Sequence, residues 1–592
     1  MCGVFGYIGK KRDDLSDFLL EGLTKLEYRG YDSAGIAILD GEKVKIVKET
    51  GEIKRLKNKL KNKTISGSVG IGHTRWATHG GATVKNSHPH TDCTGKIIVV
   101  HNGIIENYAE LKNKLKKIGH KFVSETDTEV FAHLVEEKRK KVKDFRESVR
   151  LSFNELMGLN AVVVLAPSEG IVVFRKGSPL VIGIGEDGNF VSSDIPALTT
   201  KTQKIVFLEE EQGALLYPES VLLINSKTGK LYPAIIKEIK MEEASEDMAG
   251  FDHFMMKEVF EQPEVIRRIA AIDPKEVKDA AKFIMEAWGT YFTACGTAAH
   301  AGLAATYFFS EIAKRHVNFA VGSEFPFLED FLVGKSLLIA ASQSGETMDT
   351  LEAVRMAKRH NSKVLSLVNV PGSSLERLSD KTILLKAGPE RAVLSTKAYM
   401  AKLALFLLLA YTIDGKYKEG IRILKQTAKA ISDLLQNGME KSLKSLSKKL
   451  LKDDHVYIIG RGVNYPTALE GALKIKEASY IHAEGFAGGE LKHGVIALID
   501  KGTPAIAIVA NDRAKESVLS NAIEMSSRGG FIIGIAPENH EVFDVWIKVP
   551  DVKTASPLVN IVPMQILAYH LTILKGLNPD KPRNLAKSVT VK

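Results

Sequence analysis

The second half of the chain alternates apolar, strand-like runs with amphipathic helical stretches, and it does so twice. In residues 276–430 three such runs alternate with helices, the last at 396–412, and residues 440–580 repeat that order with a helix at 466–478. Strands that alternate with helices predict a parallel sheet covered on both faces, so we expect two copies of a doubly wound α/β domain. The runs are TYFTACG, SLLIAASQSG and KVLSLVNV in the first copy, and HVYIIGRG, PAIAIVAN and GFIIGIAP in the second.

The first part of the chain shows a different pattern of predicted strands and helices. Short β runs dominate residues 2–238, and amphipathic helices such as 14–26 and 128–138 are few. This pattern predicts packed, mainly antiparallel sheets. Residues 239–275 are charged and compatible with helix, and we interpret them as a connector between domains. Residues 581–592 form a separate tail.

Composition limits the classes of function. The chain has 592 residues, 44% of them hydrophobic and 26% charged, which excludes a disordered or fibrous protein. The net charge of +10 is thinly spread, so it does not indicate nucleic-acid binding and is compatible with an anionic substrate. Only three cysteines occur, and the longest apolar run, 403–413, is too short for a bilayer. We therefore expect a soluble, cytoplasmic protein that binds no membrane.

Cys2 is a candidate nucleophile. Removal of the initiator methionine would leave a thiol and an α-amine on the same residue, and an amine with a pKa of about 7.7 to 8.0 suits a proton acceptor at neutral pH. The alternative is that Cys2 is a small buried residue at the start of a strand.

Other residues of this part fit a pocket for an amino acid amide. Arg75 offers a bidentate fork for a carboxylate, and Asp127 offers an anion for an ammonium group. Asn102 and the Gly103 amide are two donors for an oxyanion. A metal cluster is the competing interpretation of the histidines in this region, but no cysteine or carboxylate accompanies them at ligand spacing, so we expect no metal. These histidines are His73, His79, His88, His90 and His101.

The motifs CGVFG, LEYRGYDSAGIA, GHTRWATHG, HNGIIENY and SETDTE together resemble class II glutamine amidotransferase domains, which are N-terminal-nucleophile hydrolases with an αββα sandwich. The resemblance implies that Arg75 binds the glutamine α-carboxylate and Asp127 its α-amino group. It implies an oxyanion hole at Asn102 and Gly103. It also implies a loop that closes over glutamine and contributes Trp76, Thr78 and His79.

The segment ASQSGET, residues 341–347, follows an apolar strand and opens a helix. Hydroxyls and free amides at a helix N-terminus bind anions, so this segment predicts a phosphate site. The alternative is that its Ser and Thr residues only cap the helix. The preceding turn, 294–297, forms a second strand-to-helix loop at the same sheet edge and favours phosphate.

Strand, SQSGET and helix resemble the sugar isomerase (SIS) domain. The duplicated block, LEGALKIKEASYIHAEGFAGGELKHG and PRNLAKSVTVK resemble the glutamine-dependent glucosamine-6-phosphate synthases across nearly the whole chain. The resemblance implies that His493 opens the sugar ring, in the site of the neighbouring subunit of a homodimer. It implies that Lys587 forms a Schiff base with fructose 6-phosphate, that Glu477 moves a proton between C2 and C1, and that no cofactor is needed. The sugar-phosphate site implied by the resemblance contains Thr297, Ser342, Gln343, Ser344, Thr347, Val393, Ser395, Glu470, Lys474 and Ala586.

Three of the residues implied by the resemblance have helical spacing. Glu470, Lys474 and Glu477 are four and three residues apart, so a helix places them on one face. The alternative is an ordinary solvated Glu–Lys face. Two positions depart from the family pattern: Ala298 lacks a hydroxyl that commonly meets the phosphate, and Leu394 is enlarged next to the sugar.

The expected function is therefore an enzyme that hydrolyses L-glutamine and delivers ammonia to fructose 6-phosphate, giving glucosamine 6-phosphate and glutamate in amino sugar biosynthesis. One alternative is an amidotransferase acting on another phosphosugar, although neither a phosphoribosyltransferase loop nor an SGGxDS motif occurs. The other alternative is a sugar-phosphate-binding regulator with an inactive glutaminase domain.

Overall fold

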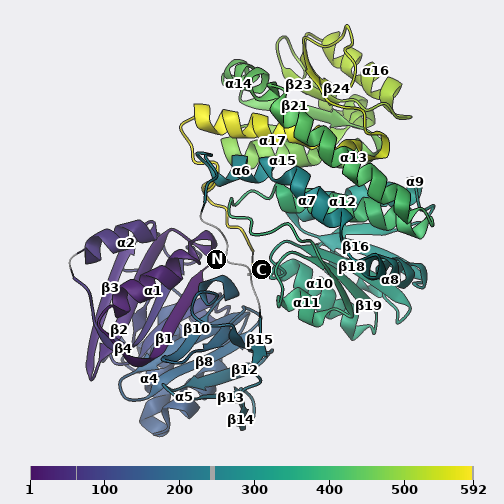
Figure 1. Ribbon diagram of the computed structural model, residues 1–592. Coiled ribbons are helices and arrows are strands. Elements are labelled where there is room, and N and C mark those ends of the chain that lie inside the picture. Colours follow the sequence, from purple (N-terminus) through teal and green to yellow (C-terminus); the bar gives the residue numbers. More distant parts are fainter. Residues whose placement is uncertain (1, 62, 240–246, 590–592) are drawn as a thin grey trace. The chain divides into compact units, whose positions relative to one another are not determined.

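The computed structural model describes residues 2–61, 63–239 and 247–589. The chain divides into two compact units, residues 1–243 with 588–592 and residues 244–587 (Figure 1). Each unit is described by itself below.

Unit 1 contains two antiparallel sheets. The first has the order β15-β11-β9-β10-β1-β4-β2-β3 and the second β14-β13-β12-β8-β7-β6-β5. The strands of the first sheet are β1 (Gly3–Arg12), β2 (Ser33–Asp40), β3 (Lys43–Thr50), β4 (Gly67–Arg75), β9 (Val181–Ile184), β10 (Gly188–Ser192), β11 (Lys204–Phe207) and β15 (Lys237–Glu238). Those of the second are β5 (His90–Thr91), β6 (Ile98–Gly103), β7 (Asn160–Ala166), β8 (Gly170–Lys176), β12 (Gln212–Leu216), β13 (Val221–Asn225) and β14 (Leu231–Pro233).

Alternation along the strands creates three apolar layers. In β1, Phe5 packs toward the helices α1 (Leu15–Thr24) and α2 (Ile53–Leu60), whereas its neighbour Val4 packs between the two sheets. In β6, Val100 packs between the sheets and Val99 packs toward the remaining helices. These are α3 (Tyr108–Lys117), α4 (Thr128–Lys141) and α5 (Phe145–Phe153). The result is the expected αββα sandwich, with α1 and α4 near the predicted positions.

Unit 2 contains two parallel sheets with the same topology. Their orders, β17-β16-β18-β19-β20 and β22-β21-β23-β24-β25, both read 2-1-3-4-5 when strands are counted along the chain. This identity confirms the predicted duplication. The first sheet comprises β16 (Gly289–Ala294), β17 (Asn318–Val321), β18 (Ser336–Ser342), β19 (Lys363–Val368) and β20 (Lys381–Leu384). The second comprises β21 (His455–Gly460), β22 (His482–Ala487), β23 (Pro504–Ile508), β24 (Phe531–Ala536) and β25 (Val545–Lys548).

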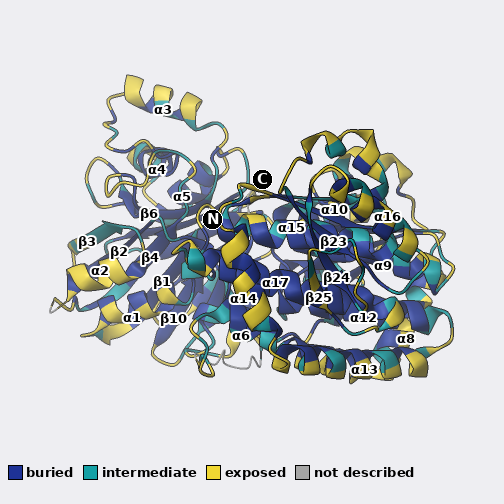
Figure 2. Cartoon of the chain, turned by 90° about the horizontal axis from the view of Figure 1, so that it is seen from above, coloured by how far each residue is buried: buried dark blue, intermediate teal, exposed yellow. Residues whose placement is uncertain are grey.

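One apolar core joins the two halves of unit 2, because it contains side chains from both sheets and from the helices between them. Figure 2 shows α12 (Lys397–Ile413) and α17 (Ser556–Leu574) almost wholly buried. The other helices are α6 (Phe254–Phe260), α7 (Gln262–Ala270), α8 (Pro274–Met285), α9 (Gly296–Glu311), α10 (Met348–Arg359), α11 (Ser374–Leu378), α13 (Tyr417–Gln436), α14 (Met439–Leu450), α15 (Tyr465–Ser479) and α16 (Lys515–Ser526).

The segment expected to be a connector, 239–275, is partly helical. Its residues 240–246 lie outside the described residues, while α6 and α7 contribute buried side chains such as Met255 and Ile266 to the core of unit 2. The exact domain boundaries stay predictions.

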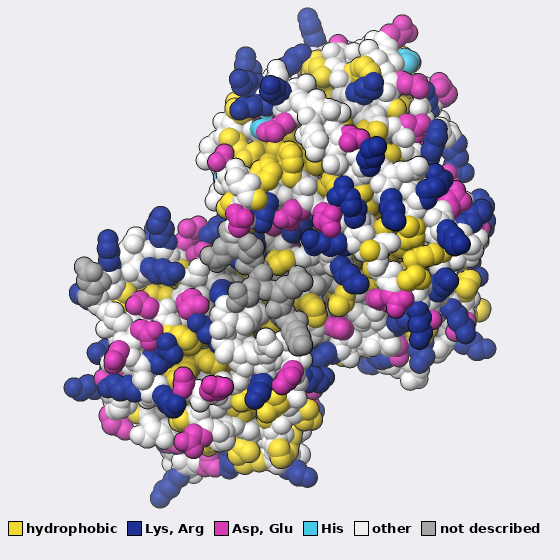
Figure 3. Space-filling model, viewed as in Figure 1, with side chains coloured by type: hydrophobic (Ala, Val, Ile, Leu, Met, Phe, Trp, Pro, Cys, Tyr) yellow, Lys and Arg dark blue, Asp and Glu magenta, His cyan; other side chains and the backbone are white. Residues whose placement is uncertain are grey.

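The surface carries charges of both signs. On the face drawn in Figure 3, Lys and Arg side chains are interspersed with Asp and Glu. Among the described residues one helix, within Lys553–Leu574, is long and apolar enough to cross a membrane, and 89% of its apolar window is buried inside the protein. This helix contains α17, and such burial is typical of a helix in the core of a protein.

Candidate functional site

Cys2 lies immediately before β1, beside the end of β4. Its Sγ accepts a hydrogen bond from the Trp76 amide at 3.3 Å, and the Gly3 amide donates to Thr74 Oγ1 at 3.1 Å. Burial raises the pKa of the Cys2 thiol, although the positive chain terminus and the Trp76 amide oppose this effect. A buried thiol of this kind needs a base beside it to become a nucleophile at neutral pH.

Asn102 and Gly103, at the end of β6, lie next to Cys2. The Asn102 Nδ2 donates to the Cys2 carbonyl oxygen at 2.9 Å. Gly103 has a φ of +130°, and a Cβ at this position would lie 2.1 Å from the Leu159 carbonyl oxygen. Only glycine fits this backbone, which explains the HNG sequence at the strand end.

Arg75 orders the loop that follows β4. Its guanidinium donates to the carbonyl oxygens of His79 at 2.5 Å, Gly80 at 3.0 Å and Gly81 at 3.1 Å. Burial lowers the pKa of Arg75, and the nearby Cys2 and Asp127 partly offset this. Trp76 and His79 on this loop are half-buried, and Thr78 is exposed.

Asp127 precedes α4 and is also buried. Its Oδ2 accepts the Ile105 amide at 2.8 Å, which ties the start of α4 to the segment after β6. Unit 1 therefore collects the buried cation and the buried anion of the predicted glutamine pocket close to the Cys2 thiol.

The neighbouring histidines support this pocket. The rings of His73 and His88 stack with centroids 4.0 Å apart, and both His88 Nε2 and His101 Nδ1 lie 2.9 Å from Thr128 Oγ1. Burial lowers the pKa of His73 to about 3 and holds that of His88 well below its ordinary value. These rings are neutral at pH 7, so they join β4 and β6 to the start of α4 as a scaffold.

In unit 2, the predicted phosphate segment lies at the sheet edge where doubly wound folds bind ligands. Ser342 ends β18 and Thr297 follows β16, and these are the third and first strands of a 2-1-3-4-5 sheet, where the strand order reverses. Cys295 Sγ lies 3.6 Å from Thr350 Oγ1, so the two strand-to-helix loops are neighbours.

The hydroxyls of this segment shape its own loop. Ser342 Oγ accepts the Gly345 amide at 3.0 Å and lies 2.9 Å from Thr347 Oγ1, and Ser344 Oγ accepts the Glu346 amide at 3.1 Å. Thr347, at the N-cap position of α10, makes no side-chain capping hydrogen bond. The side chain of Thr347 therefore does not cap α10, so the capping interpretation does not hold for this threonine. Gln343 is half-buried, and its carbonyl oxygen accepts the Asn369 amide at 3.1 Å.

The face of α15 that carries Glu470, Lys474 and Glu477 is not a solvated face. Glu470 and Lys474 are fully buried and 3.3 Å apart, and Lys474 Nζ donates to Glu477 Oε2 at 2.7 Å. Lys474 also donates to Thr297 Oγ1 at 2.9 Å, and Thr297 donates to Glu470 Oε1 at 3.0 Å. This network contradicts the alternative weighed from the sequence and joins α15 of the second copy to α9 of the first.

A second buried ion pair lies at the tail. Lys587 Nζ donates to Glu390 Oε2 at 2.5 Å and to the Ala392 carbonyl oxygen at 2.8 Å. Ser395 Oγ donates to the same carboxylate at 3.0 Å, and the Val393 amide donates to the Asp580 carbonyl oxygen at 3.0 Å. Ala586 is half-buried beside Lys587, and Leu394 is buried.

Several charged groups of this region escaped the sequence analysis. Burial alone would raise the pKa of Glu390, but Lys587 and backbone amides lower it to about 2. Burial and the Glu390 charge raise the pKa of Glu258 to about 8, and burial lowers that of Lys402 to about 8. Lys402 was detectable, because it is a charged residue inside the very apolar run AKLALFLLLA. It lies within electrostatic range of Glu390, Lys587, Glu470 and Lys474. His300 also escaped notice, and its Nδ1 lies 2.8 Å from Glu470 Oε2.

His493 does not join these groups within its own chain. It is exposed at the end of a short 3-10 helix, Gly488–His493, and makes no side-chain hydrogen bond or ion pair with any residue in the described part of the chain.

Comparisons with known proteins agree with this division. A glutamine amidotransferase domain model matches residues 73–200, and a SIS domain model matches residues 284–412 and 449–575. A protein from Pyrococcus horikoshii named glutamine–fructose-6-phosphate aminotransferase (isomerizing) is 44% identical over all of both chains. The chain belongs to this aminotransferase family. A relative of the same name from Thermococcus kodakarensis is 42% identical, again over all of both chains.

A solved structure extends the family assignment to the fold of unit 2. The C-terminal domain of glucosamine-fructose-6-phosphate aminotransferase from Francisella tularensis is 34% identical, with a TM-score of 0.53. It covers 57% of this chain and 100% of that domain. The predicted fold class, an amidotransferase domain followed by two SIS domains, is confirmed. The roles of individual site residues stay predictions.

Proposed function

We propose that this chain converts L-glutamine and fructose 6-phosphate to glutamate and glucosamine 6-phosphate, as its family name indicates. The observation that carries the proposal is that a chain matching this family over its full length contains both a half-buried Cys2 beside Asn102 and a buried Lys587–Glu390 pair. We place the reaction in the cytoplasm, because three free cysteines suit a reducing compartment.

At the first site, Cys2 attacks the glutamine side-chain carbonyl after its own α-amine accepts the thiol proton, once Met1 has been removed. The tetrahedral oxyanion is stabilised by Asn102 Nδ2 and the Gly103 amide. Collapse expels ammonia and leaves a thioester, which water hydrolyses to glutamate. Arg75 and Asp127 hold the α-carboxylate and the α-amino group. In the part of the chain that the structure describes, the side chains of Arg75 and Asp127 form hydrogen bonds to backbone groups and none to an oppositely charged side chain.

At the second site, the loop 342–347 holds the phosphate of the sugar, and His493 assists ring opening. Lys587 condenses with the C2 carbonyl to give a protonated Schiff base and water, and the Glu390 carboxylate holds the lysine nitrogen in place and balances the positive charge. Ammonia then replaces the lysine on C2, and Glu477 transfers a proton from C1 to C2 to give the aldose. The buried Lys474 orients Glu477 from 2.7 Å.

The decisive experiment follows glutamate and hexosamine phosphate together in one coupled assay. The wild-type chain is expected to form both in equal amounts from glutamine and fructose 6-phosphate. Cys2→Ala is expected to lose glutamine hydrolysis while it still isomerises hexose 6-phosphate, because the two sites lie in different units. Full glutamine hydrolysis by a folded Cys2→Ala protein would reject the assignment of the nucleophile.

We further propose a homodimer in which His493 completes the sugar site of the partner subunit. The exposed position of His493, away from the buried cluster of its own chain, supports this arrangement. Mixing inactive His493→Ala and Glu477→Gln chains is expected to restore part of the synthase activity after subunit exchange, which differently tagged chains would verify. Failure to complement despite proven exchange would show that His493 serves its own chain.

A further inference from the structure

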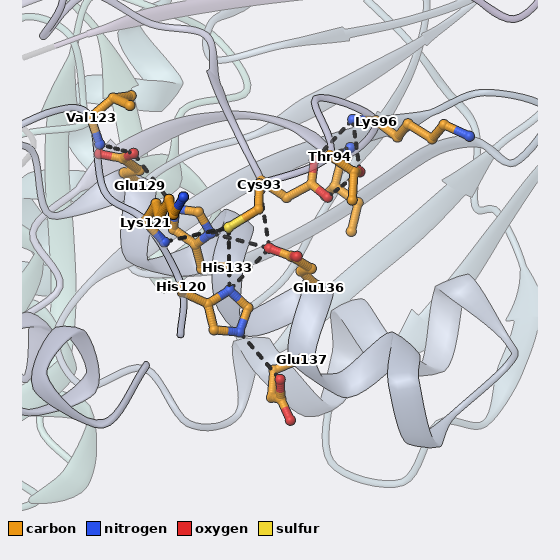
Figure 4. Close-up of polar contacts among 12 residues, drawn as sticks. Cys93, Thr94, Lys96, His120, Lys121, Val123, Glu129, His133, Glu136 and Glu137 are labelled. Atoms are coloured by element: carbon orange, nitrogen blue, oxygen red, sulfur yellow. Dashed lines mark hydrogen bonds and ion pairs between the residues drawn. The ribbon is translucent and has the colours of Figure 1, made fainter. Parts of the chain in front are cut away.

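Four potential metal ligands converge in unit 1, outside the pocket described above. Figure 4 shows Cys93, His120, His133 and Glu136 with their side chains directed toward one point. Cys93 lies in the turn after β5, His120 lies in the loop after α3, and His133 and Glu136 are one turn apart on α4. One ligand atom from each residue lies within 4.8 Å of all the others. None of the four belongs to the histidine set considered from the sequence.

Four of the six distances between these atoms are close to the edges of a tetrahedron around Zn²⁺. With bonds of about 2.3 Å to sulfur and about 2.0 to 2.1 Å to nitrogen or oxygen, a tetrahedral site has sulfur–nitrogen edges of about 3.6 Å and nitrogen–oxygen edges of about 3.3 Å. Here Cys93 Sγ lies 3.8 Å from His120 Nδ1 and 3.5 Å from His133 Nδ1. Glu136 Oε2 lies 3.0 Å and 3.2 Å from the same two nitrogens.

The second nitrogen of each imidazole faces a carboxylate. His120 Nε2 lies 3.2 Å from Glu137 Oε2, and His133 Nε2 lies 3.6 Å from Glu129 Oε1. Glu129 is itself fixed by the amides of Val123 and Ser124, at 2.7 and 2.6 Å. Carboxylates behind metal-binding histidines set the ring orientation and the tautomer that leaves the inner nitrogen free to bind.

Without a metal, hydrogen bonds alone would hold this cluster, and the Cys93 sulfur would have only weak contacts, with the Lys121 amide at 3.5 Å and with the two imidazole nitrogens. Both imidazoles present Nδ1 to Glu136 Oε2, and the same two atoms also face the Cys93 sulfur. A sulfur is a weak hydrogen-bond partner and a strong ligand for zinc. His120 and His133 are buried while Cys93 is exposed, so the site is preformed on one side and reachable from solvent on the other.

We propose that Cys93, His120, His133 and Glu136 bind one structural Zn²⁺ ion. The thiolate and two imidazoles favour zinc over the hard cations Mg²⁺ and Ca²⁺. Four protein ligands leave no open coordination position, so the ion does no chemistry on a substrate. It clamps the turn after β5 and the loop 118–127 onto α4, and that loop ends at Asp127 of the glutamine pocket.

The test measures metal binding by the full-length protein after it has been stripped with a chelator. We expect one equivalent of Zn²⁺ per chain by elemental analysis, and one equivalent of Co²⁺ with the absorption of a tetrahedral site and a thiolate-to-metal charge-transfer band. Cys93→Ser and His133→Ala should lose the equivalent and the band. Cys295→Ser and Cys2→Ala, which change the other two thiols, should keep both.

Two further measurements separate loss of ligation from loss of folding. The stripped wild-type and Cys93→Ser proteins should have the same melting temperature, and Zn²⁺ should raise only that of the wild type. Glu137→Gln, which changes the carboxylate behind His120 and no ligand, should weaken Zn²⁺ binding by about 10- to 100-fold. Absence of the charge-transfer band in the wild type, or its persistence in folded Cys93→Ser, would overturn the proposal.

Discussion

The buried Glu390 carboxylate allows a quantitative test of how the tail that carries Lys587 is held. Replacement by glutamine keeps the size of the side chain and removes the negative charge that faces Lys587 at 2.5 Å. Glu390 has a pKa of about 2 in place of its ordinary 4.5. At about 1.4 kcal/mol per pKa unit, this depression corresponds to about 3 kcal/mol of stabilisation at pH 7.

The expected change in melting temperature follows from the size of unit 2. For about 340 residues, at about 2.1 cal/mol/K each, the entropy of unfolding is about 0.7 kcal/mol/K, so a loss of 3 kcal/mol lowers the melting temperature by about 4 °C. Calorimetry of the full chain measures this, and the transition of unit 2 is recognised by its shift when fructose 6-phosphate is added.

The difference should depend on pH in a defined direction. Because the pKa of Glu390 is lower in the folded than in the unfolded chain, its stabilisation is fully present above about pH 4.5 and is lost as the pH falls toward 2. The gap between the wild type and Glu390→Gln should therefore shrink between pH 5 and pH 3. An absent gap at pH 7, or one that stays constant down to pH 3, would refute the argument.

A double-mutant cycle identifies Lys587 as the partner. Lys587→Met alone leaves Glu390 buried without its cation and should cost about 3 to 5 kcal/mol, whereas the double variant Glu390→Gln/Lys587→Met should lose much less than the sum of the two. Borohydride trapping with fructose 6-phosphate gives a second readout, since the adduct should form on the peptide that contains Lys587 and be absent from Lys587→Met. Additive losses would show that the two side chains are not coupled.

Two further outcomes are expected in unit 2. Ser344→Ala should weaken fructose 6-phosphate binding by about 1 to 3 kcal/mol, which is the range for a hydrogen bond to a charged group. Glutamine hydrolysis measured without sugar should not change. An unchanged KM for the sugar would contradict the phosphate site. Lys474→Met should destabilise the protein by about 3 to 5 kcal/mol in calorimetry, because the buried Glu470 carboxylate loses its buried cation and keeps Thr297 and His300 as partners. Glu470→Gln in the same chain should restore most of the loss. Equal stability of the single and double variants would contradict that pairing.

Sequence patterns predicted the elements well because local periodicity decides them. The helix expected at 466–478 is α15, and the repeated strand and helix order became two sheets of identical topology. The spacing of Glu470, Lys474 and Glu477 correctly placed them on one face. The burial of that face did not follow from spacing, since it depends on contacts of α15 with α9 and α17.

Groups assembled from distant segments were harder to predict. Glu390 and Lys587 are 197 residues apart, and no local pattern joins them. The proposed zinc ligands likewise come from three segments, and only the one-turn spacing of His133 and Glu136 is visible in the sequence. His73 and His88 stay neutral because they are buried, and burial is not visible in the motifs GHTRWATHG and HPH that contain them.

The engagement of the tail has a practical consequence for work with this protein. Lys587 lies five positions before Lys592, and Ser588 next to it is buried, so a peptide fused after Lys592 would begin within a few residues of the Glu390 pair. A peptide fused before Cys2 would block its α-amine. The turn between β2 and β3, at the exposed Gly41 and Glu42, is a safer place for an affinity tag. A purification handle inserted there leaves Cys2 and the Lys587–Glu390 pair as they are.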